Sequence, residues 1–208
     1  MITLTNKNWL LAINNLKKKD KILKEIINKY KSDKLHSKKN AFLTLAKSIT
    51  GQQISVKAAN SIWLQLEKKI KKIDPANILK TKINVIKKCG FSKQKANYIF
   101  NLANFFLINK EIERKWKKMD DEKITNSLMK IKGVGKWTAE MFLIFYLLRP
   151  NVFPKNDLGL HKAISINYKK KYPLKELEME KFRKKWDPWA TVAIWYLWRS
   201  LDPIPVKY

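Results

Sequence analysis

The chain has 208 residues, of which 45% are hydrophobic, and a formal net charge of +28. A chain of this length and composition can bury a substantial core in one domain or two closely packed ones, which indicates a globular protein. Its single cysteine excludes an intramolecular disulfide, a four-cysteine iron–sulfur cluster and a cysteine-rich zinc site. The positive charge makes a polyanion the first partner to consider.

The basic residues are nearly all lysines, since the only arginines are Arg114, Arg149, Arg183 and Arg199. An AT-rich genome imposes this bias on any cytosolic protein, so the charge is compatible with DNA binding but does not establish it. The longest apolar stretch, residues 141–148, is too short to cross a membrane, and residues 9–13 are too short for a signal peptide. We therefore expect a cytoplasmic protein, nucleoid-associated if prokaryotic, with no membrane partner.

Apolar residues recur at helical spacing along the chain, whereas the alternating pattern of strands is missing. The sequence therefore predicts an all-α protein. The stretch that begins at Lys136 is apolar on nearly every side, so its helix should lie in the interior. The helices expected in chain order lie within residues 1–37 (a single N-terminal helix) and over residues 42–49, 56–70, 120–129, 136–148, 158–166 and 192–198.

Two glycines two residues apart, Gly133 and Gly135, separate the helices expected over 120–129 and from Lys136. This spacing predicts a tight hairpin between two helices. The amide N–H groups at the start of the second helix, together with the positive end of its dipole, would attract a nucleic-acid phosphate. Alone, such a hairpin is a weak signal, because any turn between helices can use these glycines.

Three separate segments resemble one protein superfamily. Residues 128–139 resemble the helix-hairpin-helix of the DNA glycosylases that carry a catalytic aspartate in a downstream loop. Residues 49–59, with paired glutamines, are similar to the alkyladenine branch, of the 3-methyladenine DNA glycosylase II type, and so are the C-terminal segments 186–189 and 195–199. The resemblance implies an all-α, two-lobed helix-hairpin-helix glycosylase fold with the active site in the cleft between the lobes.

The expected domain organisation follows from this resemblance. Residues 1–37 form the N-terminal helix, which packs with the C-terminal lobe; residues 38–149 form a helical, barrel-like lobe that ends in the helix-hairpin-helix; and residues 150–208 form the C-terminal lobe with the catalytic aspartate. Trp137 would line one wall of the cleft and Asp157 the other. Because the family-like segment begins near residue 40, we expect a minimal catalytic core without the β-rich N-terminal domain of some relatives.

Asp157 is the candidate catalytic residue that the resemblance implies. Hydrolysis of an N-glycosidic bond passes through a cation on the deoxyribose, which a fixed carboxylate stabilises. A second carboxylate, which would protonate the base, is not evident; alkylated purines that already carry positive charge do not need one. An Asp just ahead of an apolar helical stretch is also an ordinary helix N-cap, and this alternative stays open.

Trp137 distinguishes two kinds of chemistry. Bifunctional glycosylase/lyases of the superfamily carry at this position a Lys that forms a Schiff base with the sugar. Lys136 is rotated from it by about 100° around the helix and cannot simply replace it. A Trp offers a π face to a cationic alkylated base, although it could equally belong to the core. Met141 and Trp195 are the further candidates for the base pocket.

The resemblance also implies the DNA contacts. Gln53 is the expected wedge that fills the space left by the flipped nucleotide, and Gln52 supports it; the alternative is an ordinary helix start capped by Ser55. The hairpin would bind a phosphate through the main chain and neighbouring side chains. The expected DNA-binding residues are Gln52, Gln53, Lys132, Gly133, Val134, Gly135, Lys136 and Thr138, and main-chain carbonyls of Met129, Lys132 and Val134 are the implied ligands of a monovalent cation.

The sequence thus predicts a monomeric, monofunctional DNA glycosylase of base excision repair that acts on alkylated purines, of the 3-methyladenine and 7-methylguanine type, in double-stranded DNA. No cofactor is required; the resemblance implies a structural Na⁺ or K⁺ ion at the hairpin. The alternatives are a glycosylase/lyase for oxidised bases and a helix-hairpin-helix protein that binds DNA without catalysis. His36 and His161 are too isolated to indicate a metal pair, and they are expected at the surface or in caps.

Overall fold

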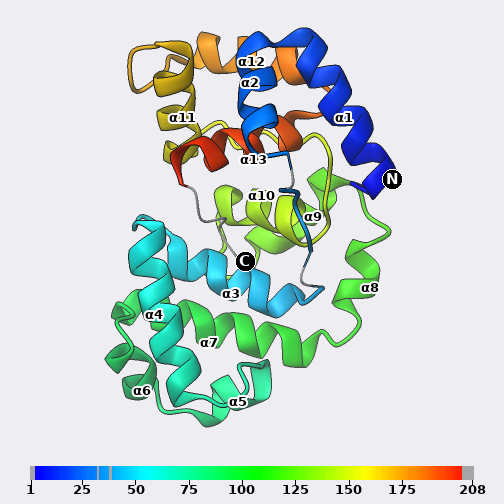
Figure 1. Ribbon diagram of the computed structural model, residues 1–208. Helices are drawn as coiled ribbons and strands as arrows, with labels where there is room; N and C mark the ends of the chain where they lie inside the picture. Colours follow the sequence, from blue (N-terminus) through cyan, green and yellow to red (C-terminus); the bar gives the residue numbers. More distant parts are fainter. Residues whose placement is uncertain (1–2, 32, 38, 203–208) are drawn as a thin grey trace. The chain divides into compact units, whose positions relative to one another are not determined.

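The computed structural model describes residues 3–31, 33–37 and 39–202. Over these residues the chain forms thirteen α-helices and no strand, which confirms the prediction of an all-α protein (Figure 1). None of the described helices is long and apolar enough to span a bilayer. The chain divides into two compact units, one of residues 37–146 and one made of the N-terminal segment up to His36 together with the segment from Leu147 onward. Residue 38, where the second expected segment begins, lies outside the described residues.

The first unit contains the helix-hairpin-helix. Its core is formed by α10, which packs against α3 and α9, while α3 also packs against α7. Helices α4 to α7 gather at one end of this unit (Figure 1). The helices are α3 (Ala41–Gly51), α4 (Val56–Lys69), α5 (Pro75–Lys80), α6 (Ile83–Lys88), α7 (Lys93–Ile108), α8 (Ile112–Trp116), α9 (Asp121–Met129) and α10 (Lys136–Phe145).

Helix α10 lies in the interior of the first unit, as its apolar sequence predicts. Phe142 is fully buried, and its ring contacts Trp116 edge-to-face with 5.1 Å between the ring centroids. Such aromatic pairs add to the free energy gained by burying their apolar surface. The core therefore fixes the direction of α10, and with it the position of the hairpin at its N-terminal end.

The second unit combines both ends of the chain. Its helices are α1 (Asn6–Lys19), α2 (Lys21–Lys29), α11 (Leu158–Tyr168), α12 (Glu176–Trp186) and α13 (Ala190–Leu201). Helix α13 packs against α1, α2, α11 and α12, and its buried residues include nearly every position from Ala190 to Leu197. This confirms the interior helix predicted over residues 192–198.

The expectation of a single N-terminal helix is wrong, because the helical segment breaks at Asp20. The Asp20 carboxylate accepts hydrogen bonds from the amides of Ile22 and Leu23, both at 3.1 Å, and thereby starts α2 as a new helix. Its other oxygen accepts hydrogen bonds from Tyr168 Oη (2.8 Å) and Trp186 Nε1 (3.1 Å). Asp20 is 2% exposed and joins the N-terminal segment to α11 and α12.

The pKa of Asp20 reflects these contacts. Burial raises it, but hydrogen bonds from Lys185, Trp186 and Tyr168 outweigh burial, so that the pKa lies below its ordinary value. Burial and the nearby Asp20 carboxylate in turn raise the pKa of the Tyr168 hydroxyl. The cluster is therefore organised around an ionised Asp20.

The helices expected around the site residues are confirmed, except that α10 ends at Phe145, before the expected end at residue 148. Helix α9 ends at Met129, α10 begins at Lys136 and α11 begins at Leu158. Helix α11 extends two residues beyond the predicted end, to Tyr168, and is followed by Lys169 in the left-handed conformation with φ +52°. Local capping and apolar spacing thus determine the elements on which the candidate site stands.

Candidate active site

The turn between α9 and α10 is the predicted hairpin. The amide of Ile131 donates to the carbonyl of Leu128, and the amide of Val134 donates to the carbonyl of Ile131, each at 2.9 Å. Gly133 has φ +100°, and a Cβ atom built on it would lie 2.2 Å from Cγ of Tyr98. Both its backbone conformation and its surroundings therefore require glycine at this position.

Gly135 plays a different part in the hairpin. Its φ of −92° is open to any residue, and a Cβ atom built on it would meet nothing within 4 Å. It is the N-cap of α10 and contributes no capping side chain. Lys132 and Lys136 on either side are exposed. The glycine thus leaves room for another molecule to approach the positive end of α10 closely.

The turn between α3 and α4 carries the two expected glutamines. Gln53 is exposed and has φ +56°, a left-handed conformation that is uncommon for a residue with a side chain. Ile54 beside it is 38% exposed. Ser55 caps α4 by accepting a hydrogen bond from the amide of Ala58 at 3.2 Å, as the alternative in the sequence analysis predicts. We call residues 52–55 the glutamine loop.

Gln52 connects the glutamine loop to the hairpin. Its Nε2 donates to the carbonyl of Gly133 at 3.0 Å and to Oγ1 of Thr138 at 2.9 Å. The Thr138 side chain is buried, so its hydroxyl binds Gln52 instead of facing the surface as a phosphate contact would. The two segments expected to contact DNA are therefore joined by one side chain.

Lys95 is a residue that the sequence analysis did not select. It lies in the first turn of α7, and its Nζ donates to the carbonyls of Thr50 (2.8 Å) and Gln52 (2.7 Å). Partial burial lowers the pKa of Lys95 from its ordinary value. Among so many lysines, no local signal distinguishes it from those that only cover the surface.

Asp157 is the N-cap of α11, and its carboxylate is held on one oxygen by two donors. Oδ1 accepts a hydrogen bond from the amide of Leu160 at 2.6 Å and from Nε1 of Trp198 at 3.0 Å. Asp157 is 9% exposed. The capping contact is confirmed, and the catalytic role stays a prediction. Trp198 lies in the C-terminal segment 195–199 that resembles the alkyladenine branch, but no pattern in the sequence indicates its contact with Asp157.

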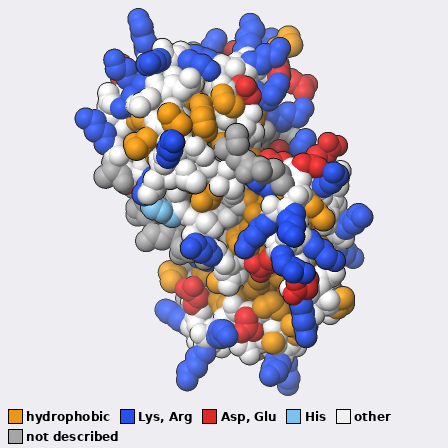
Figure 2. Space-filling view, turned by 90° about the vertical axis from the view of Figure 1, so that its right-hand side faces the viewer, with side chains coloured by type: hydrophobic (Ala, Val, Ile, Leu, Met, Phe, Trp, Pro, Cys, Tyr) orange, Lys and Arg blue, Asp and Glu red, His pale blue; other side chains and the backbone are white. Residues whose placement is uncertain are grey.

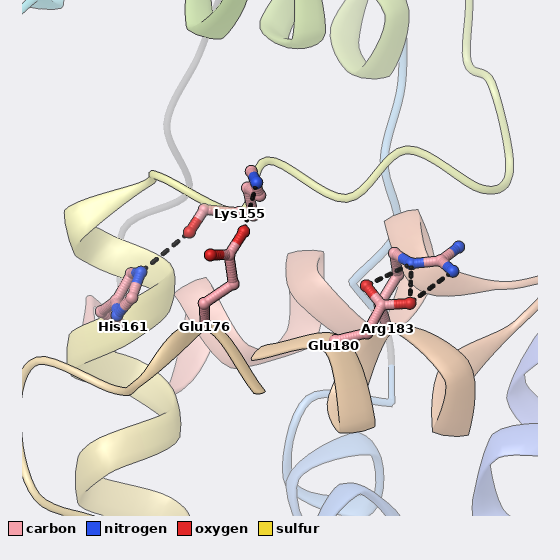
Figure 3. A network of polar contacts seen from close by, with 5 residues as sticks. All are labelled: Lys155, His161, Glu176, Glu180 and Arg183. Carbon is pink, nitrogen blue, oxygen red and sulfur yellow. Dashed lines mark hydrogen bonds and ion pairs between the residues drawn. The ribbon is translucent and has the colours of Figure 1, made fainter. Parts of the chain in front are cut away.

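Hydrogen bonds and an ion pair hold the loop before Asp157 in place, as Figure 3 shows. Lys155 Nζ pairs with Glu176 at 2.7 Å, and the carbonyl of Lys155 lies 2.8 Å from Nε2 of His161. Because the amide of Leu174 donates to Nδ1 of His161 at 3.1 Å, Nε2 carries the proton and donates to Lys155. His161 thus connects the loop before Asp157 to the loop before α12.

The aromatic and sulfur candidates for a base pocket differ in their surroundings. Trp137 is half-buried at the second position of α10, and Met141, one turn further, is 1% exposed. Trp195 on α13 is 6% exposed and packs edge-to-face against Trp9 and Tyr196, with centroid distances of 5.5 Å and 5.0 Å. Trp137 and Met141 belong to the first unit and Trp195 to the second. That they line one pocket stays a prediction.

Lysine and arginine side chains are scattered over the face of each unit seen in Figure 2, and they do not gather in one patch. The distribution agrees with the view that part of the charge is solvated surface. Within the described parts of the chain, no group of three or more His, Cys, Asp or Glu side chains could hold a metal ion. The net charge therefore does not locate the candidate site, whereas the geometry of the hairpin and of Asp157 does.

Residues 46–188 match the sequence profile of the HhH-GPD superfamily of base excision DNA repair proteins. The match covers more than half of the chain, so the protein belongs to this superfamily. It includes the glutamine loop, the hairpin and Asp157, and it confirms the resemblance found in the sequence.

Individual relatives make the comparison more specific. The chain is 35% identical over 161 residues to the alkylbase DNA glycosidase-like protein mag2 of Schizosaccharomyces pombe, which covers 74% of this chain and 75% of the relative. It is 29% identical over 198 residues to DNA-3-methyladenine glycosylase 1 of the same organism, covering 86% and 81% of the two chains.

A solved structure shows the fold. The 3-methyladenine DNA glycosylase Mag1 of Schizosaccharomyces pombe, in complex with abasic DNA, superposes with a TM-score of 0.80 over 95% of this chain and 98% of that chain, at 24% identity. The expected all-α helix-hairpin-helix glycosylase fold is therefore confirmed.

Proposed function

We propose that the protein is a monofunctional DNA glycosylase of base excision repair that hydrolyses the N-glycosidic bond of alkylated purines flipped out of duplex DNA. The observation that carries the proposal is the Asp157 carboxylate, held by two hydrogen bonds at the start of α11 in a member of the HhH-GPD superfamily. The names of the relatives, an alkylbase glycosidase-like protein and a 3-methyladenine glycosylase, support alkylated bases as the substrate class.

The reaction needs one main contribution from the protein. The bond between C1′ of the sugar and the base nitrogen breaks, and the base leaves with the bonding electron pair. The oxygen of a water molecule then bonds to C1′ and releases a proton, which leaves an abasic site. Positive charge develops on the sugar in the transition state, and the Asp157 carboxylate would stabilise it. Purines alkylated at N3 or N7 are already cationic and leave as neutral bases, so a general acid is not required.

Trp137 supports hydrolysis over lyase chemistry. The side chain at this position carries no amine, so it cannot form the Schiff base on which a glycosylase/lyase depends. Its indole would instead attract a cationic base by about 0.5 to 2 kcal/mol, an attraction that neutral bases do not share. Met141, one turn further along α10, is proposed to line the base pocket with it.

DNA binding is assigned to the hairpin and the glutamine loop. Amides at the start of α10 would hold a phosphate, with Lys132 and Lys136 beside it, while Gln53 would fill the space of the flipped nucleotide. The hydrogen bonds within the hairpin and from Gln52 use the carbonyls of Leu128, Ile131 and Gly133, and not those of Met129, Lys132 and Val134. These three carbonyls would hold the implied Na⁺ or K⁺ ion, which would add positive charge at the hairpin for a phosphate.

The test is the substitution Asp157→Asn, assayed by release of 3-methyladenine from methylated DNA and identification of the base by mass spectrometry. Asn still caps a helix, so α11 should persist while the negative charge is lost. We expect base release to fall by about a thousandfold or more, with DNA affinity retained. Asp74→Asn is the matched control, because Asp74 caps α5 through the amide of Asn77 at 2.9 Å. An unchanged rate in Asp157→Asn would refute the assignment.

The capping contact of Asp157 favours a second candidate, a helix-hairpin-helix protein that binds DNA without catalysis. The same assay separates the two, since such a protein would bind duplex DNA and release no base. Incubation with borohydride addresses the lyase alternative, because only a Schiff base would be trapped as a covalent adduct with DNA. Salt dependence cannot distinguish these candidates, because all of them would lose affinity as salt rises.

A further inference from the structure

Trp198 is an aromatic residue of α13 whose polar atom points at the candidate catalytic group. Its Nε1 donates to Oδ1 of Asp157 at 3.0 Å across 41 residues of sequence. The same oxygen accepts the amide of Leu160 at 2.6 Å. Two donors on one oxygen fix both the distance of the carboxylate from α11 and its rotation about the side-chain bonds, which a single capping bond would not do.

Gly159 gives the second, independent observation. It is the second residue of α11, and a Cβ atom built on it would lie 3.1 Å from Asp157 Oδ1 and 3.5 Å from Trp198 Nε1. Glycine within a helix costs about 1 kcal/mol relative to alanine. No positive φ requires glycine at this position. A residue that is unfavourable for the helix therefore stands at the position where a larger side chain would crowd the contact between the indole and the carboxylate.

We propose that Trp198 is a positioning residue, which aims the Asp157 carboxylate at the reacting sugar through its indole N–H and needs Gly159 for this contact. The inference rests on the proposed function of Asp157. An indole N–H is a suitable donor for this purpose, because it carries no charge and cannot accept a proton. A lysine or arginine here would neutralise the negative charge that the sugar cation requires. The indole orients the carboxylate and leaves its charge intact.

The main variant is Trp198→Phe, which keeps an aromatic ring and removes the donor. We expect single-turnover release of 3-methyladenine to fall about tenfold, as for a hydrogen bond to a charged group, while affinity for a duplex with an abasic analogue stays the same. The rate should fall without a fall in the melting temperature, because the aromatic ring stays and only the donor is lost. A role in packing alone would instead lower the melting temperature.

The matched control is Trp63→Phe in the first unit. Trp63 Nε1 donates to the Glu67 carboxylate at 2.8 Å, so the control removes the same kind of bond from a buried tryptophan outside the candidate site. Its rate should equal that of the unaltered protein. Gly159→Ala is the second variant. It keeps both partners but crowds their contact, so the rate should fall while the melting temperature stays or rises, since alanine favours the helix.

A measurement without turnover separates failure of this inference from failure of the proposed function. The indole N–H resonance of Trp198 should shift in Asp157→Asn. If the protein releases no base but the resonance responds, the function fails and the contact stands without a catalytic role. The inference is overturned if the resonance is the same in Asp157→Asn, or if an active protein keeps its rate in Trp198→Phe.

Discussion

The two units hold their candidate functional groups by different means. In the first unit the groups expected to bind a phosphate are main-chain amides of the hairpin, whose shape is fixed by Gly133 and by uncharged hydrogen bonds from Gln52. In the second unit the group is a carboxylate, oriented by an indole and a helix start. Binding a phosphate needs many weak donors in a fixed shape, whereas stabilising a cation needs one charge at one place.

The way in which each group is held predicts which substitutions disturb it. A shape made from the main chain is disturbed by an added carbon wherever that carbon meets a neighbouring group, as it would at Gly133. A charge held by donors is disturbed by lost atoms, because each missing donor lets the carboxylate rotate. Substitutions that add atoms to the hairpin should therefore affect the first unit. Substitutions that weaken the bonds to an acidic side chain should affect the second.

The largest effect is expected from Gly133→Ala in the hairpin. The new Cβ would lie 2.2 Å from Cγ and 2.5 Å from Cβ of Tyr98, near the root of that side chain, where rotation cannot relieve the clash. The positive φ adds strain, and together they should lower the free energy of unfolding by about 3 kcal/mol. Urea denaturation measures this loss. A variant as stable as the unaltered protein would show that the hairpin is not fixed as described.

The next effect concerns Asp20, the buried carboxylate that joins α2 to α11 and α12. Asp20→Asn should lower the free energy of unfolding by about 2 kcal/mol, because it removes the charge that Lys185 pairs with at 2.8 Å and disturbs the bonds from Tyr168 and Trp186. The pKa of Asp20 is lowered in the folded state, so its contribution is present above the unfolded pKa and is lost as the pH falls through the folded pKa.

The difference in unfolding free energy between the unaltered protein and Asp20→Asn should therefore be largest near neutral pH and shrink below about pH 4. Denaturation curves at pH 7 and at pH 3 measure it. A difference that stays constant over this range would mean that the ionised carboxylate does not organise the cluster. Asp74→Asn, at a more exposed cap in the first unit, is the control and should change stability less.

Much of the fold was accessible from the sequence because its signals are local. Helix α9, the hairpin and α10 follow from an N-cap, two glycines and an apolar stretch that are adjacent in sequence. The break at Asp20 was missed although it is also local. Lysines surround this residue and no glycine or proline marks the break, so apolar spacing alone suggested one continuous helix.

The contacts that support the site could not be predicted in the same way. Gln52 reaches Gly133 across 81 residues, and Trp198 reaches Asp157 across 41. Such pairs depend on how the helices pack, and periodicity carries no information on which of eight tryptophans meets a given carboxylate. Sequence therefore indicated the residues that would act, whereas the structure identifies those that hold them.

Gly135→Ala should affect DNA affinity rather than stability, in contrast to Gly133→Ala. A Cβ here meets nothing within 4 Å, so the unfolding free energy should change by only a few tenths of a kcal/mol. The methyl group would nevertheless occupy the space in front of α10, where a phosphate is expected, and we expect about a tenfold weaker Kd, or about 1.4 kcal/mol. Fluorescence anisotropy with a labelled duplex measures it. Equal affinities would place the phosphate elsewhere.

Lys95→Met should have the smallest of these effects and lower the free energy of unfolding by about 1 kcal/mol. The side chain keeps its apolar stem and loses only the donor to the carbonyls of Thr50 and Gln52. Without this donor the glutamine loop should open more often, so amide hydrogen exchange should quicken from Gln52 to Ser55 and base flipping, followed by 2-aminopurine fluorescence, should weaken. Lys93→Met, at an exposed position of the same helix, is the control. Unchanged exchange in the loop would mean that Gln52 alone holds it against the hairpin, whereas the Asp157 carboxylate of the second unit is held by two donors.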